Sequence, residues 1–170
     1  MIIDLAIVGN TAKQIDVSLD PAEIDLDGEN VTLTSNVVLS GELERIGARA
    51  HLGGIIKTEV RLECSRCLEP VEKHLDFPVR AIFVDSNDED TGTEAEISDE
   101  ALDESVVHDG EIDLAEVVRE QVLLSLPEQI FCREDCKGLC PKCGANLNLI
   151  DCICADDEVD PRWEALKSLK

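Results

Sequence analysis

The sequence predicts an α+β protein with an antiparallel, β-rich N-terminal part, a packed helix and an acidic loop, followed by a small C-terminal four-cysteine zinc module and a terminal helix. Three observations predict this class. Short β-branched runs alternate with polar residues up to about residue 84, one amphipathic helical pattern follows residue 113, and eight cysteines fall in four close pairs. We therefore expect a β-rich domain over residues 1–130 and a zinc module with its helix over residues 131–170.

The strand pattern is clearest in a predicted hairpin. Alternate residues from Ile56 to Cys64 form one apolar face, with charged residues on the other face, which indicates a strand with one side buried. After the turn at residues 64–67, a second alternating run extends from Val71 to Phe83. Pro78 lies inside this run and cannot donate a ladder hydrogen bond, so we expect an edge or a bulge there. The two runs predict an antiparallel hairpin with a cysteine pair at its tip.

An acidic loop and a helix are expected after the hairpin. No lysine or arginine occurs between Arg80 and Arg119, and acidic residues crowd a stretch with few large apolar groups, so residues 86–108 should form a loop. Asp113 is suited to cap a helix over residues 113–126 that ends before Pro127. A terminal helix is expected from residue 160 to 169. The apolar stripe of the first helix comprises Leu114, Val117, Val118, Val122 and Leu126.

Charge and composition limit the function classes. The formal net charge is -23, which disfavours charge-driven binding of nucleic acid and favours a basic protein partner. The alternative is that the acidity only provides solubility. Aromatic residues make up 2% of the chain, so few rings are present on which bases could stack. The sequence contains no long apolar run and no export signal, so we expect a cytoplasmic protein without membrane contact.

The cysteine pairs indicate zinc. In a reducing compartment, paired cysteines are more typical of metal ligands than of disulfides. A Cys-x-x-Cys turn supplies two of the four thiolates that zinc requires, and Gly144 permits the positive φ that such a turn needs after its second ligand. The first-choice ligand set is Cys140, Cys143, Cys152 and Cys154.

The other two pairs leave alternatives open. Cys64 and Cys67 can share a second zinc with Cys132 and Cys136, or either member of the latter pair can replace a ligand of the first site. One zinc ion or two are therefore expected. A disulfide framework, a redox dithiol at residues 64 and 67, and simple packing of Cys64 as a small apolar residue are the competing interpretations.

Motifs of catalysis are missing. The sequence contains no dinucleotide or phosphate-binding glycine motif and no nucleophile elbow, so no small-molecule substrate is indicated. His51, His74 and His108 are scattered through strand or loop segments. A zinc ion held by four cysteines has no open position at which to activate water, so a structural site is expected and an enzyme is not.

Three motifs, in this order, resemble the YceD family of bacterial and plastid large ribosomal RNA subunit accumulation proteins. They are Cys64-Ser-Arg-Cys67-Leu-Glu-Pro70, Gly110-Glu-Ile-Asp-Leu114, and the run from Cys132 to Asn148. The segment from Asp160 to Leu169 is similar to the closing helix of the family. The resemblance implies a non-enzymatic factor for accumulation or processing of 23S ribosomal RNA. It also implies that the pair at residues 64 and 67 can occur without the C-terminal cysteines.

These observations favour a ribosome-assembly factor that binds a basic ribosomal protein or another assembly factor of the large subunit, with weak or indirect contact to the RNA. Direct RNA binding through Arg133, Lys137 and Lys142 is the alternative within this class. A zinc-handling protein that serves a neighbouring zinc ribosomal protein is the second hypothesis, and a thiol oxidoreductase is the third.

Overall fold

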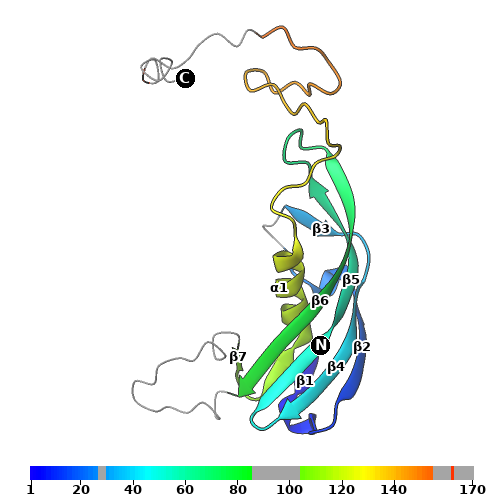
Figure 1. Cartoon of the computed structure of the whole chain (residues 1–170), viewed down its shortest axis with the longest axis vertical. Coiled ribbons are helices and arrows are strands. Elements are labelled where there is room, and N and C mark those ends of the chain that lie inside the picture. Colours follow the sequence, from blue (N-terminus) through cyan, green and yellow to red (C-terminus); the bar gives the residue numbers. More distant parts are fainter. Residues whose placement is uncertain (27–29, 86–103, 155–161, 163–170) are drawn as a thin grey trace.

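The computed structural model describes residues 1–26, 30–85, 104–154 and 162, and its architecture confirms the α+β class (Figure 1). Within these residues, one long, strongly coiled sheet covers one α-helix, and a second, two-stranded sheet lies beside them. The strands are β1 (Ile2–Asp4), β2 (Lys13–Leu19), β3 (Val31–Leu33), β4 (Val37–Ile46), β5 (Arg49–Glu63), β6 (Pro70–Asp85), β7 (Glu104–Val107) and β8 (Glu111–Asp113), and the helices are the short 3-10 turns η1 (Leu5–Ile7) and η2 (Pro21–Glu23) and the α-helix α1 (Leu114–Ser125).

The large sheet has the strand order β2-β4-β5-β6-β7, and β3 pairs with β5 beyond the end of β4. All of its pairings are antiparallel except the parallel pairing of β6 with β7. The small sheet joins β1 to β8, so the first residues of the chain lie next to the segment that precedes α1.

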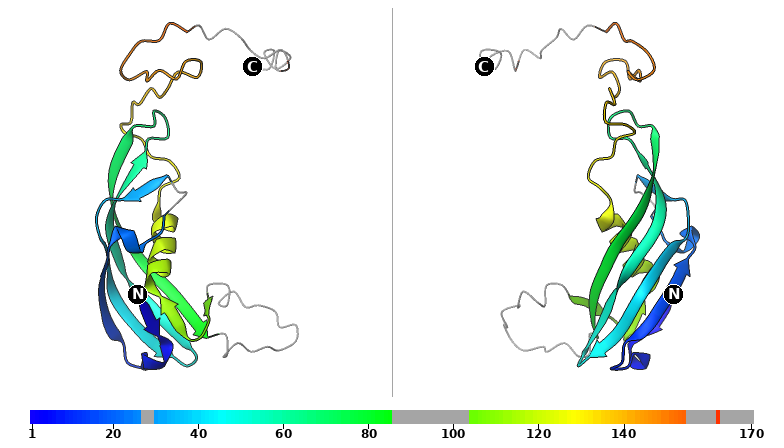
Figure 2. Two further views of the ribbon diagram at one scale, coloured as in Figure 1. Left: turned by 180° about the vertical axis from the view of Figure 1, so that it is seen from behind. Right: turned by 45° about the vertical axis from the view of Figure 1, so that its right-hand side comes forward.

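The hairpin of β5 and β6 is the longest feature of the fold. Its register runs without interruption from Arg49 opposite Val84 to Glu63 opposite Pro70, so no bulge occurs at Pro78. β7 pairs only with residues 82–85 of β6, and Pro78 therefore lies on an edge as far as the described strands extend. The far end of the hairpin projects beyond the helix and carries the 64–67 turn (Figure 2).

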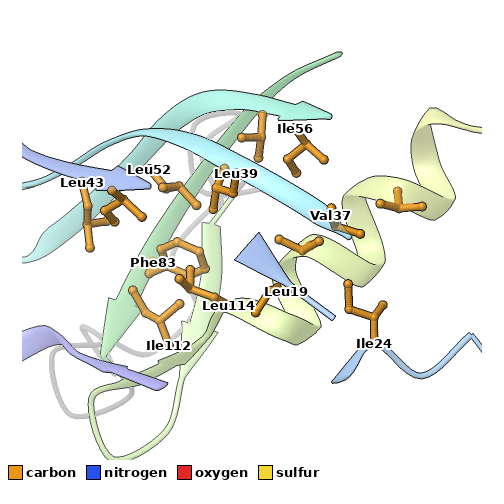
Figure 3. Close-up of a cluster of buried hydrophobic side chains, with 14 of the residues drawn as sticks. Leu19, Ile24, Val37, Leu39, Leu43, Leu52, Ile56, Phe83, Ile112 and Leu114 are labelled. Atoms are coloured by element: carbon orange, nitrogen blue, oxygen red, sulfur yellow. The ribbon is translucent and has the colours of Figure 1, made fainter. Parts of the chain in front are cut away.

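The core lies between the concave face of the large sheet, α1 and the small sheet (Figure 3). Asp113 caps α1 as predicted, since its side chain accepts the N–H of Ala115 at 3.0 Å. Leu114, Val118 and Val122 are buried by the sheet. The remaining two stripe residues, Val117 and Leu126, are partly buried against this core.

The prediction of a loop up to residue 108 was wrong at its C-terminal end, because residues 104–107 form β7. The β-branched Val106 and Val107 suit a strand, and Glu104 pairs with Arg49 at 2.6 Å. The rest of that loop, residues 86–103, lies outside the described residues, as does the expected terminal helix apart from Arg162.

The division into domains at residue 130 stays a prediction. No helix in the described ranges is long and apolar enough to cross a membrane.

A pair of glycines permits the tight coiling of the sheet. Gly41 of β4 lies directly opposite Gly54 of β5. A Cβ on Gly54 would lie 2.6 Å from the carbonyl oxygen of Ser40 and 2.9 Å from Cα of Gly41. The two backbones therefore approach more closely than any side chain allows, and the concave face can close around α1.

Gly54→Ala is expected to lower the free energy of unfolding by about 1–3 kcal/mol, because the added methyl group would have to displace backbone. Gly53→Ala is the matched control, since a Cβ there meets nothing within 4 Å. Chemical denaturation of both variants beside the unmodified protein measures the difference. Equal stability of the two variants would contradict the close-approach explanation.

Candidate metal centre

All eight cysteines lie in two groups of four at the far end of the β5–β6 hairpin. The inner group comprises Cys64, Cys67, Cys132 and Cys136, and the outer group comprises Cys140, Cys143, Cys152 and Cys154. Within each group the sulfur atoms lie within 4.8 Å of one another. The inner group joins the hairpin tip to the segment after α1, whereas the outer group belongs entirely to the C-terminal module.

The distances between sulfur atoms fit four-thiolate metal coordination. The Sγ atoms of Cys64 and Cys136 are 3.8 Å apart, and those of Cys67 and Cys132 are 3.6 Å apart. In the outer group, Sγ of Cys152 lies 3.5 Å from Cys143 and 3.4 Å from Cys140. A tetrahedron with zinc–sulfur bonds of about 2.3 Å has edges of about 3.8 Å, whereas a disulfide bond is about 2.05 Å long. All eight cysteines are free thiols, so the disulfide interpretation is not supported.

The two Cys-x-x-Cys turns have the same backbone structure. In each, the carbonyl of the first cysteine accepts the N–H of the residue after the second cysteine, at 2.9 Å in the inner group and 2.8 Å in the outer group. The N–H of the first cysteine donates to the carbonyl one residue further on, at 2.9 and 2.8 Å. The residue after the second cysteine has a positive φ, 61° at Leu68 and 70° at Gly144. The positive φ predicted for Gly144 is therefore confirmed, and Leu68 holds the same conformation with a side chain.

The shared backbone structure of the two turns helps to choose between the interpretations of Cys64 and Cys67, which are a metal site, a redox dithiol and simple packing of Cys64. A redox dithiol usually places its first thiol at a helix N-terminus, whereas these two cysteines lie at a hairpin tip. Cys64 is fully buried, as the packing interpretation also requires, but its sulfur faces three other sulfurs. Its environment therefore fits a turn that could hold a metal ion better than simple packing.

Backbone N–H groups stabilise one thiolate in each turn. Burial raises the pKa of Cys64, but hydrogen bonds from the N–H groups of Arg66, Cys132 and Cys67 outweigh burial and lower that pKa to about 6. The N–H groups of Cys143 and Lys142 likewise lower the pKa of Cys140 to about 6.

In each group, the pKa of one other thiol is raised instead. Burial and the neighbouring sulfurs raise the pKa of Cys132 to about 12. Hydrogen bonds with Cys152 and Cys143 raise the pKa of Cys154 to about 12. Four sulfurs this close cannot all ionise without a counter-charge, which a divalent cation would supply.

Arg66 fixes the inner group from within its own turn. Its guanidinium donates to the carbonyl of Cys136 at 3.0 Å and to that of Glu134 at 3.3 Å, and it lies 4.3 Å from the ring centre of Phe131. Its carbonyl accepts the N–H of Leu139 at 3.0 Å. The hairpin tip and the C-terminal module are thus joined by contacts that need no metal.

Asn148, which lies in the chain between Cys143 and Cys152, holds this part of the module on the inner group. Its side-chain N–H donates to Sγ of Cys136 at 3.3 Å, and its side-chain oxygen accepts the N–H of Lys137 at 2.8 Å. Such hydrogen bonds to a ligating sulfur orient it toward a metal. Arg66 and Asn148 both fall inside the cysteine motifs of the sequence, but spacing alone does not reveal what their side chains contact.

Every cysteine that the sequence suggested as a metal ligand lies in one of the two groups. The first-choice set forms the outer group without substitution, and the other four cysteines form a second group of their own. In the described part of the chain, neither group includes a histidine. Arg133, Lys137 and Lys142 are all exposed on the module, and Arg133 pairs with Asp135 at 3.4 Å.

Comparisons with known proteins identify relatives across bacteria and plants. The model of the family described as large ribosomal RNA subunit accumulation protein YceD matches residues 52–170. An uncharacterized protein of Mycobacterium tuberculosis is 29% identical, over 98% of this chain and 79% of its own length. An uncharacterized protein of Bacillus subtilis is 28% identical, over 92% of this chain and 87% of its own. The chloroplastic large ribosomal RNA subunit accumulation protein YCED homolog 1 of Zea mays is 29% identical, over 89% of this chain and 59% of its own. No solved structure matches.

The strained conformation at Leu68 yields a test of the inner turn. Leu68→Val is expected to be less stable than Leu68→Gly by about 1–2 kcal/mol, because a β-branched residue tolerates a positive φ poorly and glycine adopts it freely. Leu68 is 56% exposed, so the loss of its side chain removes little packing. Denaturation of the two variants under identical metal conditions measures the difference, and a more stable valine variant would show that packing determines this position.

Proposed function

Because this chain belongs to the YceD family of large ribosomal RNA subunit accumulation proteins, we propose that it is a non-enzymatic, cytoplasmic factor for accumulation of 23S ribosomal RNA and assembly of the large subunit. We propose further that it acts through a basic protein partner and that zinc occupies its cysteine groups. The choice of partner rests on an acidic groove beside β7, β8 and α1. β7 lies at the end of the molecule opposite the cysteine module (Figure 1).

Zinc is the metal that the donor set favours. Four thiolates at the corners of a tetrahedron suit this ion, which has no redox chemistry and accepts closed coordination by cysteine. The inner group would then hold the module on the hairpin, and the outer group would hold the module together. Because four protein ligands leave no open position, the metal would be structural, which supports a non-enzymatic role.

The acidic groove lies between β7, β8 and α1 and has a volume of about 370 Å³. Glu111 and Asp113 approach it from β8, and Glu116 and Glu120 approach it from the first two turns of α1. All four side chains are exposed. The walls of the groove also include the apolar residues Ile2, Phe83, Val106, Val107, Ile112 and Val117.

Charge and backbone geometry favour an extended basic segment in this groove. No lysine or arginine of the described residues lines it, and among those residues Glu111, Glu116 and Glu120 form no ion pair. β7 ends the strand order of the large sheet, so its outer backbone groups are unpaired within the described strands. A partner segment can add to such an edge and place alternate lysine or arginine side chains among the carboxylates. Apolar residues between them would contact the groove walls.

Direct binding of RNA is less well supported. The three cations of the cysteine module are matched by three acids, Glu134, Asp135 and Asp151, within residues 132–154. The phosphate backbone would therefore meet no net positive charge there, and the rest of the chain is strongly acidic. A protein partner that itself contacts the RNA avoids this repulsion.

The groove is tested by the double variant Glu116→Gln with Glu120→Gln. Binding to basic large-subunit proteins stripped from ribosomes by salt should weaken about 5- to 30-fold, since each lost charge pair is worth about 0.5–1 kcal/mol. The difference should shrink as salt is added. Titration calorimetry or interferometry with purified proteins measures both effects.

Asp16→Asn with Glu59→Gln is the matched control, because these exposed acids lie on β2 and β5, away from the groove, and their removal changes net charge equally. Equal weakening by both double variants would assign the interaction to net charge alone. Tight binding of naked large-subunit RNA, with no binding of the proteins, would overturn the proposed partner.

A further inference from the structure

The two cysteine groups differ in how far solvent reaches their sulfurs. In the inner group, Cys64, Cys67 and Cys136 are at most 4% exposed, and only Cys132 faces solvent. In the outer group, Cys140 alone is buried, while Cys143 and Cys154 are exposed and Cys152 is partly so. An incoming ligand can therefore reach the outer sulfurs from solvent but meets protein around most of the inner ones.

The inner ligands are held by contacts that do not involve sulfur. Ser65 donates its N–H to the carbonyl of Ile130 at 2.8 Å, and its hydroxyl accepts the N–H of Ile130 at 3.1 Å. Arg66 adds its hydrogen bonds to the backbone of the module. These contacts keep the hairpin tip on the module even when one metal–sulfur bond breaks, so that bond can re-form at once.

The second cysteine pair of the outer group, Cys152 and Cys154, is not held by comparable hydrogen bonds. Among the described residues, every hydrogen bond that the arm of residues 151–154 forms involves sulfur. Sγ of Cys152 contacts those of Cys140 and Cys143 and accepts the N–H of Cys154 at 3.3 Å. Ile153 is 99% exposed, so the arm makes little apolar contact with the other residues that the structure describes. Its position therefore depends on the metal that its two thiolates would bind.

We infer that the outer group is an exchangeable metal site, which passes its ion to incoming thiolate ligands, whereas the inner group retains its ion. This inference rests on the proposed binding of zinc. In the exchange, a thiolate approaches from solvent and forms a bond to the metal as the bond to an exposed cysteine, Cys143 or Cys154, breaks. Three further exchanges of the same kind at the remaining sulfurs complete the transfer. Each released thiolate takes a proton from water, and the metal stays divalent throughout.

Because of Asn148, exchange at the outer group can proceed without movement of the inner group. It precedes the arm and remains bonded to Cys136 and Lys137 through its side chain, so release of residues 151–154 does not require the inner group to move. Opening of a small, weakly held segment is much easier than opening of the folded core.

The test uses the full chain loaded with zinc and challenged with the chromogenic chelator 4-(2-pyridylazo)resorcinol. Two phases of release are expected, one equivalent each, with rates that differ roughly tenfold or more. Iodoacetamide added after the fast phase should modify Cys140, Cys143, Cys152 and Cys154, as identified by peptide mass, while Cys64, Cys67 and Cys136 stay protected.

Cys143→Ser with Cys154→Ser should abolish the fast phase and leave the slow rate unchanged. Release of two equivalents in one phase, or early alkylation of Cys64 and Cys67, would overturn the inference while leaving the proposed metal binding intact. Purified protein that takes up no zinc and is alkylated at all eight cysteines together would overturn both.

Discussion

The pairing of β5 with β6 is the constraint on which the rest of the molecule depends. Its uninterrupted register covers all 15 residues of β5. One half of the hairpin supplies core residues such as Ile56, Val79 and Phe83, and the other half carries a cysteine pair away from that core. Because side chains alternate strictly along a strand, a shift by one residue would expose the core face and turn Cys64 away from its partners.

Local patterns in the sequence were sufficient to predict the hairpin, the helix and the cysteine turns. Alternation identified the buried faces of β5 and β6, and an aspartate followed by an apolar stripe identified α1. Each of these signals lies within a short stretch of chain, where periodicity and capping chemistry act directly. The spacing of Cys140, Cys143 and Gly144 even predicted the sign of one backbone angle.

The features that the sequence did not reveal are nonlocal. β7 is four residues long and is defined by parallel pairing to β6 across an intervening segment, and β1 is defined by pairing with β8, more than 100 residues later. Strands this short carry too few residues for alternation to be recognised. The assignment of cysteines to groups left alternatives open, because Cys67 and Cys132 are brought together only by the fold. The contacts of Arg66 and Asn148 depend on that same proximity.

Viewed as cross-links in a polymer, the two cysteine groups constrain the chain very differently. Cys67 and Cys132 are 65 residues apart, whereas Cys143 and Cys152 are 9 apart. The entropy lost when a flexible chain is closed into a loop grows with the logarithm of loop length, so the longer closure restricts the unfolded ensemble by about 1.8 kcal/mol more. An ion in the inner group therefore couples to the stability of the entire β-rich body, and an ion in the outer group couples only to the few turns that surround it.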